Sequence, residues 1–282
     1  MRSNSFAFKF LEFYGTRIPH RGQWWVHAKL RKWLQADVNA ELRVVRDGHQ
    51  WLLNPSDFVQ TEFFWLGSRE AWDVFHAKAL VRPGCTIFDV GANFGHYAIT
   101  LAEATGRTCV VHAFEPFPPN TERLRTNVGL NHLDQIVHIH PMALSDSITS
   151  RTMTTRADNS GAAHLNEDGE GCLVEVTTLD SFCVEQGIAR LDFMKIDVEG
   201  QEEKLLRGGG ETIRKFGPVI QIELDPPKLL RAGSSVDRLV SLLADLRYDL
   251  LVPERTKLVP LRELPRGPDY INVFCFPKAR NS

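Results

Sequence analysis

The chain has 282 residues, of which 43% are hydrophobic, and its 33 basic side chains nearly balance 35 acidic ones. This length suffices for one large globular domain with an added segment. The formal charge of −2 excludes a strong positive electrostatic field that would attract nucleic acid. A small molecule is the more fitting substrate. The five cysteines are scattered without a C-x-x-C pair, and we find no secretory signal and no apolar run of about 20 residues, so we expect a cytoplasmic protein without a transmembrane segment.

Residues 1–80 predict a helical segment outside the main domain. Residues 1–34 carry seven Lys or Arg against a single acid, Glu12, and the stretch WWVHAKLRKWL (24–34) has the composition of a basic, aromatic amphipathic helix. Three roles stay open for this helix: packing on the domain or on a second subunit of a homodimer, a lid over the substrate, or a peripheral contact with a membrane.

Residues 81–282 predict an α/β domain with a Rossmann-like, mostly parallel sheet and helices on both faces, because short β-branched and aromatic runs alternate with helical patterns. The expected strands are 86–90, 109–114, 136–140, 191–198 and 218–224. The expected helices are 94–105, 120–131, 199–209 and 236–246, and Asn120 is expected to cap the second of them. The stretches YDLLV and YINVFCFP are expected to close the sheet as an antiparallel pair.

Between the third and fourth strands the pattern changes to an antiparallel excursion. Residues 151–155 and 173–177 have the alternation of two strands, and the polar, Gly-rich residues 158–171 between them predict a mobile loop.

The stretch TIFDVGANFGHY (86–97) marks the first candidate site. A strand ends near Asp89, the chain turns over the carboxyl edge of the sheet, and a helix begins. Ligands of open α/β sheets bind at this edge. Gly91 and Gly95 are expected to let a cofactor approach the backbone, since a Cβ there would occupy its space. A plain strand-to-helix turn is the alternative.

Two classes of cofactor compete for this turn. A dinucleotide site favours G-x-G-x-x-G, but Asn93 stands where the second glycine is needed, and Asp89 would face negative phosphates. S-adenosylmethionine carries an ammonium and a sulfonium and no phosphate, so it suits the acid better. Glu115 ends the second strand, where a carboxylate can accept both hydroxyls of a ribose. Ala143 and Leu144 are expected at the adenine edge, although such a pair is as often plain core.

The segments FDVGANFGHYAI, FEPFPPNTERLRTNV, ALSD, VTTLDSF, LDFMKIDVEGQEEKLLRGG and PVIQIEL resemble, in order and spacing, the successive motifs of the FkbM-type methyltransferases. The resemblance covers residues 82–224. It implies a class I, S-adenosylmethionine-dependent O-methyltransferase that acts on a hydroxyl of a secondary metabolite, a sugar or a lipid-linked glycan. The cofactor contacts expected from the motifs and the resemblance are Asp89, Gly91, Ala92, Asn93, Gly95, Glu115, Pro116, Phe117, Asn120, Ala143, Leu144 and Asp197.

Methyl transfer from a sulfonium is an in-line displacement, so a strong base is helpful but not required. Asp197 and Glu199 leave the fourth strand in KIDVEG and Glu223 ends the fifth, so the three acids are expected at one crevice. They could accept the acceptor's proton, bind its hydroxyls, or hold Mg²⁺ with waters, and capping of the next helix is a structural alternative. The candidate catalytic residues are Asp197, Glu199 and His96, and no metal ligand is assigned. His96 begins a helix, so packing is its alternative role.

Two other functions stay open. A non-catalytic module that keeps the cofactor fold is the alternative from another class, although the acids Asp89, Glu115, Asp197 and Glu199 are all present. An NAD-linked oxidoreductase is the enzymatic alternative, and Asn93 in the glycine turn counts against it.

Overall fold

The computed structural model describes residues 10, 13–15, 18, 25–26, 29–30, 41–54, 57–67, 70–156, 159–166 and 171–279. The chain divides into two compact units, the first made of residues 1–71 and 156–161 and the second of residues 72–155 and 162–282. All of the candidate site residues belong to the second unit. Of the helix expected at 24–34, Trp25, Val26, Lys29 and Leu30 are described and helical, and the rest of that stretch lies outside the described residues.

The first unit contains a β-hairpin that the sequence did not lead us to expect. Strands β1 (Leu42–Arg46) and β2 (His49–Leu53) pair antiparallel. The two residues that join them, Asp47 and Gly48, both have positive φ, as a tight two-residue hairpin turn requires. Helix α3 (Phe58–Leu66) follows, and the buried ring of Trp51 in β2 packs edge-on against Phe63 of α3. This unit is therefore not purely helical.

Eight described strands form the central sheet of the second unit, in the order β13-β12-β14-β11-β10-β3-β4-β5. The five strands from β11 to β5 run parallel, and β14, β12 and β13 extend the sheet antiparallel. The bounds are β3 Thr86–Val90, β4 Val110–Phe114, β5 Val137–His140, β10 Phe193–Ile196, β11 Val219–Leu224, β12 Tyr248–Glu254, β13 Lys257–Pro260 and β14 Ile271–Pro277. The mostly parallel sheet and its antiparallel closure are confirmed.

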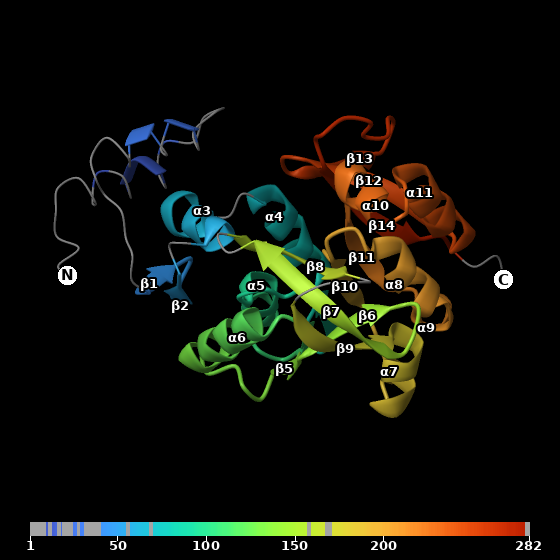
Figure 1. Cartoon of the computed structure of the whole chain (residues 1–282), viewed down its shortest axis with the longest axis horizontal. Coiled ribbons are helices and arrows are strands. Elements are labelled where there is room, and N and C mark those ends of the chain that lie inside the picture. The colour runs from blue at the N-terminus through green and yellow to red at the C-terminus, as the bar shows by residue number, and fades with distance from the viewer. Residues whose placement is uncertain are drawn as a thin grey trace. The chain divides into compact units, whose positions relative to one another are not determined.

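Helices lie on both sides of this sheet, and in Figure 1 α5 and α6 are on one side of β10 while α8 and α9 are on the other. The bounds are α4 Ala71–Leu80, α5 His96–Ala104, α6 Pro118–Leu130, α7 Leu179–Glu185, α8 Glu202–Gly208, α9 Gly210–Phe216, α10 Pro226–Arg231 and α11 Val236–Asp245. No helix in the described part of the chain is both long and apolar enough to cross a membrane. Since β4 and β5 follow β3 to one side and β10 lies on the other, the strand order reverses at β3, and ligands of open α/β sheets bind at the carboxyl ends of the strands at such a point.

Apolar side chains explain why β3, β4 and β10 lie inside the sheet, with none of them at an edge. Strands that are buried on both faces consist almost entirely of apolar residues, and Phe88, Phe114 and Met194 are all completely buried. The ring of Phe182 in α7 meets those of Phe88 and Phe114 edge-on, at centroid distances of 5.8 and 4.7 Å. This packing holds β3 and β4 against α7.

A second, four-stranded sheet of described residues confirms the antiparallel excursion and corrects its middle part. Strands β6 (Met142–Ser145), β7 (Thr149–Arg156), β8 (Asn159–Asn166) and β9 (Cys172–Thr178) follow the order β6-β9-β7-β8, with β7 antiparallel to β9. The prediction of a loop at 158–171 is wrong over residues 159–166, which form β8. Its sequence, NSGAAHLN, lacks the apolar alternation by which a strand is recognised.

Helix α6 begins before Asn120, so the prediction that Asn120 is its N-cap is wrong. Pro118 and Pro119 occupy the first helical positions, and Phe117 is the N-cap residue without a side-chain bond. Proline suits the first turn because its fixed φ is helical and its missing N–H has no partner to lose there. Asn120 instead lies buried inside the first turn, where its side chain hydrogen-bonds Glu115.

Candidate active site

The loop between β3 and α5, here called the glycine loop (residues 91–95), has a defined backbone conformation. Gly91, Asn93 and Gly95 all have positive φ, at 83°, 50° and 97°. The amides of Gly91 and Ala92 both donate to Phe114 O in β4, each at 3.0 Å. Glycine adopts left-handed conformations without a Cβ penalty, and asparagine tolerates them better than most residues. These bonds hold the loop against the carboxyl end of β4.

The two glycines are needed for internal packing, whereas we expected them to make room for a ligand. A Cβ on Gly91 would collide with the carbonyl oxygen of Asp197, and a Cβ on Gly95 would lie 2.7 Å from Cδ1 of Leu124 in α6. A sequence shows that a glycine has no Cβ, but not whether a ligand or another part of the chain occupies the space beside it. Gly91 therefore lets two loops of the carboxyl edge touch, and a direct contact of either glycine with a cofactor stays a prediction.

Asp89 lies beneath this loop and is completely buried. Its Oδ2 accepts a hydrogen bond of 2.8 Å from Ala98 N, in the first turn of α5. The first amides of a helix have no partner within the helix, and negative charge is favourable at that end. Asp89 thus ties β3 to α5, and its predicted contact with the positive end of a ligand stays a prediction.

Glu115 connects the glycine loop to the end of β4. It is 5% exposed, its Oε2 accepts from Asn93 N at 2.8 Å, and its Oε1 accepts from Phe117 N at 3.0 Å. Burial raises the pKa of Glu115 to about 7, although the hydrogen bonds from Phe117, Asn93 and Asn120 favour the charged form. A carboxylate has about four acceptor sites, and Asn93, Phe117 and Asn120 use three of them, so Glu115 can take about one further donor from a ligand.

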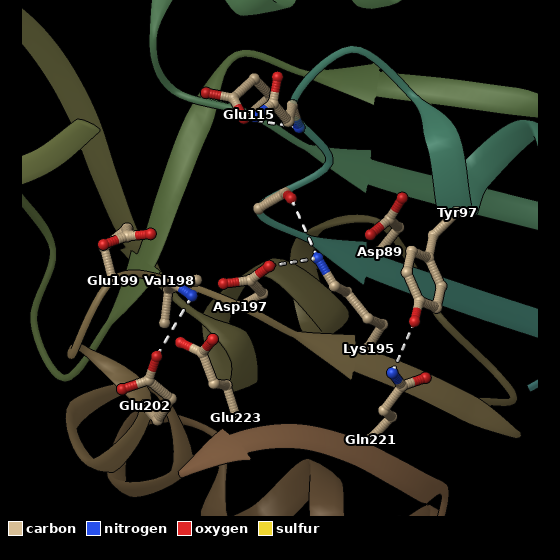
Figure 2. A network of polar contacts seen from close by, with 12 residues as sticks. Asp89, Tyr97, Glu115, Lys195, Asp197, Val198, Glu199, Glu202, Gln221 and Glu223 are labelled. Carbon is tan, nitrogen blue, oxygen red and sulfur yellow. Dashed lines mark hydrogen bonds and ion pairs between the residues drawn. The ribbon is translucent and has the colours of Figure 1, made fainter. Parts of the chain in front are cut away.

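A row of polar side chains crosses the sheet beneath α5. The strand register places Asp89 of β3, Lys195 of β10 and Gln221 of β11 next to one another. Gln221 Nε2 donates to Tyr97 Oη in α5 at 2.7 Å, and the ammonium of Lys195 lies 5.1 Å from the centre of the Tyr97 ring. This row, seen in Figure 2, places a polar layer inside an otherwise apolar interface.

Lys195 reaches from this row to the carboxyl edge. Its Nζ donates to Gly91 O at 3.4 Å. It also donates to Asp197 Oδ2 at 3.0 Å, a bond drawn as a dashed line in Figure 2. The side chain of Lys195 is 8% exposed and that of Asp197 is 33% exposed. Burial opposes ionisation of Asp197, but the charges of Lys195 and Lys228 outweigh it and hold the pKa of Asp197 below its ordinary value.

The three candidate acids meet at this edge, as expected, and two of them, Glu199 and Glu223, pair with one ammonium group. Lys228 of α10 places Nζ 2.8 Å from Glu223 and 2.9 Å from Glu199. Burial, together with the charge of Asp197, raises the pKa of Glu223 to about 9 and also raises that of Glu199. Burial lowers the pKa of Lys228, but the surrounding carboxylates outweigh it and raise that pKa above its ordinary value. The edge therefore pairs an ionised Asp197 with more readily protonated neighbours.

Glu202 holds the turn that follows β10. Its Oε1 accepts from Gly200 N at 3.1 Å and from Val198 N at 3.3 Å. Two residues of this turn, Glu199 and Gly200, have positive φ. Glu202 is 1% exposed, and burial raises its pKa to about 7. A buried carboxyl group of α8 thus fixes the turn that carries Glu199.

His96 begins α5 and is half-buried among rings. Its imidazole stacks on Phe94 with centroids 6.1 Å apart and meets Tyr97 edge-on at 5.7 Å. These contacts account for His96 as a packing residue, and its role as a base stays a prediction.

The other predicted cofactor residues lie at two places. Pro116 and Phe117 are half-buried between Glu115 and α6, while Ala143 and Leu144 are buried in β6. Their contacts with a cofactor stay predictions.

Three residues of the site, Lys195, Lys228 and Glu202, had no role in the sequence analysis. Lys195 could have been found, because it lies on β10 two residues before Asp197, which directly follows the strand, and alternation places both on the same face. Lys228 gave no such signal, since only the fold brings α10 to the end of β10. Within the described ranges, no group of three or more His, Cys, Asp and Glu side chains is arranged to hold a metal ion.

Comparison with known proteins identifies the family to which the chain belongs. Residues 89–250 match the model of the methyltransferase FkbM domain. The 31-O-demethyl-FK506 methyltransferase FkbM of Streptomyces tacrolimicus is 30% identical over 160 residues, which cover 45% of this chain and 60% of that protein. The 2-O-methyltransferase NoeI of Sinorhizobium fredii is 30% identical over 156 residues, covering 48% and 62%. The match spans less than two thirds of either curated relative.

Solved structures resemble the chain more distantly. TYW2 of M. jannaschii in complex with AdoMet is 15% identical, with a TM-score of 0.47 and 85% of each chain covered. Methyltransferase FkbM from Methylobacillus flagellatus KT is 18% identical, with a TM-score of 0.45, and the match covers 83% of this chain and 56% of that one. The assignment rests on the family model, which matches more than half of the residues. The chain belongs to the methyltransferase FkbM domain family.

Proposed function

We propose that the protein is an S-adenosylmethionine-dependent O-methyltransferase that acts on a hydroxyl of a small molecule. The observation that carries the proposal is the pair of acceptors at the glycine loop. Asn93 Oδ1 is buried and has no hydrogen-bond partner in the described part of the chain, and Glu115, bonded to Asn93, Phe117 and Asn120, keeps about one further acceptor site. A buried acceptor without a partner is costly, so this pair fits a ligand that brings hydroxyl or ammonium donors and no phosphate.

The names of the relatives support the class of acceptor. One is a 31-O-demethyl-FK506 methyltransferase and another a 2-O-methyltransferase, so both names specify transfer to oxygen. When bound at the glycine loop and Glu115, S-adenosylmethionine would supply a methyl group activated on a sulfonium. We extend the acceptor to a hydroxyl of a secondary metabolite, a sugar or a lipid-linked glycan.

Asp197 is the residue that we assign to the acceptor hydroxyl. It is the most exposed of the three candidate acids, and Lys195 and Lys228 keep it ionised. Its role is to accept a hydrogen bond from the hydroxyl, to orient the oxygen, and to take the proton as the new O–C bond forms. A carboxylate with a lowered pKa is a weak base, but in-line displacement depends mainly on orientation.

A transfer assay tests the proposal. The protein is incubated with S-adenosylmethionine and a panel of hydroxylated metabolites, sugars and glycans, and mass spectrometry detects products that gain one methylene. We expect at least one product, formed together with one S-adenosylhomocysteine per methyl group. Binding of S-adenosylhomocysteine without transfer to any acceptor would favour a non-catalytic module, and binding of NAD instead would contradict the proposal.

A further inference from the structure

The glycine loop and the end of β10 meet in a direct backbone junction. Asp197 N donates to Val90 O at 3.0 Å, and the carbonyl of Asp197 lies where a Cβ of Gly91 would be. The loop expected to hold the cofactor and the acid assigned to the acceptor are therefore in contact at the level of the main chain.

A single side chain braces this junction. Lys195 Nζ binds the carbonyl of Gly91 on one side and the carboxylate of Asp197 on the other, at 3.4 and 3.0 Å. The lysine is enclosed by the polar row beneath α5, with Tyr97 facing its ammonium. A buried ammonium held by such contacts stays in place, because moving it away would leave buried charge unpaired.

We propose that Lys195 is a positioning residue that couples the cofactor loop to Asp197. Its hydrogen bond to Gly91 O keeps the loop in the conformation that receives the cofactor, and its charge keeps the Asp197 carboxylate ionised and aimed at the acceptor side. The inference rests on the proposed function, which assigns the cofactor to the glycine loop and the acceptor hydroxyl to Asp197. The coupling itself is a property of the protein without ligand.

Other charged groups also shift the pKa of Asp197, so the test must separate the effect of Lys195 from theirs. Lys228 of α10 favours its ionised form, whereas Glu199, Glu202 and Glu223 are negative neighbours that Asp197 influences in turn. Of the two cations, Lys195 lowers the pKa of Asp197 more than Lys228 does. Among the described residues, Lys195 is also the one of the two that donates a hydrogen bond to the Asp197 carboxylate. Removing Lys195 alone should therefore change Asp197 even with Lys228 intact.

Two substitutions divide the role of Lys195 into its parts. Lys195→Gln removes the charge and keeps an N–H donor on a side chain one atom shorter, and Lys195→Met removes both the charge and the donor. Lys257→Met, at an exposed site on β13, is the matched control. The first readout is the pKa of Asp197 without ligand, from ¹³C NMR of labelled carboxyl groups assigned by the signal that disappears in Asp197→Asn. The second is the affinity for S-adenosylhomocysteine by titration calorimetry.

The coupling predicts a different result for each variant. In both Lys195→Gln and Lys195→Met the pKa of Asp197 rises by about 1–3 units, as expected when an opposite charge close by is lost. Affinity for S-adenosylhomocysteine falls about tenfold or more in Lys195→Met and by less in Lys195→Gln, because only the former loses every N–H donor on the side of Gly91 O. Lys257→Met matches the wild type in both measurements.

Three outcomes would overturn the inference. These are an unchanged pKa of Asp197 in both variants, equal affinities of the wild type and Lys195→Met, and failure of both variants to fold while Lys257→Met folds, which would make Lys195 a folding residue. If the wild type itself does not bind S-adenosylhomocysteine, the proposed function fails, while the NMR measurement still decides whether Lys195 controls Asp197.

Discussion

Replacing Gly91 by alanine perturbs the junction of two loops by one methyl group. Gly91 has φ of 83°, a conformation in which an L-residue is strained, and its new Cβ would overlap the carbonyl oxygen of Asp197. That oxygen belongs to the main chain at the end of a buried strand, so it cannot rotate away as a flexible side chain would.

The expected cost has two parts. A left-handed conformation costs a non-glycine residue about 1–2 kcal/mol, and forcing an extra methyl group against fixed neighbours costs about 1–3 kcal/mol. Gly91→Ala should therefore lower the free energy of unfolding by about 2–5 kcal/mol. Gly187→Ala separates the parts, because Gly187 has φ of 62° and a Cβ there meets nothing within 4 Å. Only the first part, about 1–2 kcal/mol, applies to it.

Urea denaturation of the wild type and the two variants, followed by circular dichroism, measures the difference. We expect Gly91→Ala to be the less stable variant by at least about 1 kcal/mol, with an unchanged dependence on urea. Equal stability of the two variants would show that Gly91 and Asp197 are not in contact, and would refute the reasoning.

Three further predictions concern buried polar groups. Because the folded pKa of Glu202 is raised from 4.5 to about 7, the protein holds this proton more tightly than the unfolded chain, and the contribution of Glu202 to stability is lost as pH rises through 7. Glu202→Gln should thus be more stable than the wild type by up to about 3 kcal/mol at pH 8.5 in urea denaturation, and by less than about 1 kcal/mol at pH 5; a constant difference would contradict this. Burial lowers the pKa of both His112 and His140 to about 4, so their contribution to stability is lost as pH falls from about 6.5 to 4, and ¹⁵N NMR should show neutral rings at pH 5; charged rings at that pH would disprove it. Tyr97→Phe should cost about 1–3 kcal/mol in thermal or urea unfolding by leaving Gln221 Nε2 without its acceptor, and Gln221→Met should recover part of that loss; additive losses would argue against the pair.

The course of the sheet was predictable because its signals are local. Apolar runs such as TIFDV mark buried strands, and the order of strands and helices defines a parallel sheet whose carboxyl edge collects Asp89, Glu115 and Asp197. The strand β8 was missed because its small and polar residues carry no periodic pattern, and the hairpin of the first unit because we gave its turn residues, Asp47 and Gly48, no weight.

The partners of the site residues were less predictable, because they depend on what lies opposite in space. A Cβ on Gly91 would collide with Asp197, which is distant in sequence. Two acids of the edge, Glu199 and Glu223, are paired with Lys228, which comes from a helix without any motif. Asn120 was expected to cap a helix, but the helix begins earlier, at two prolines. The side chain of Asn120 hydrogen-bonds Glu115 instead.

Titration calorimetry with S-adenosylhomocysteine, on the wild type, Glu115→Ala and Glu122→Ala, tests the central claim most directly. Glu122 is an exposed residue of the same helix that bonds Glu115, so it controls for loss of a carboxylate. The account predicts one bound ligand per chain, binding at least about tenfold weaker in Glu115→Ala, and unchanged binding in Glu122→Ala. No measurable binding by the wild type at millimolar ligand, or equal affinity in Glu115→Ala, would contradict it.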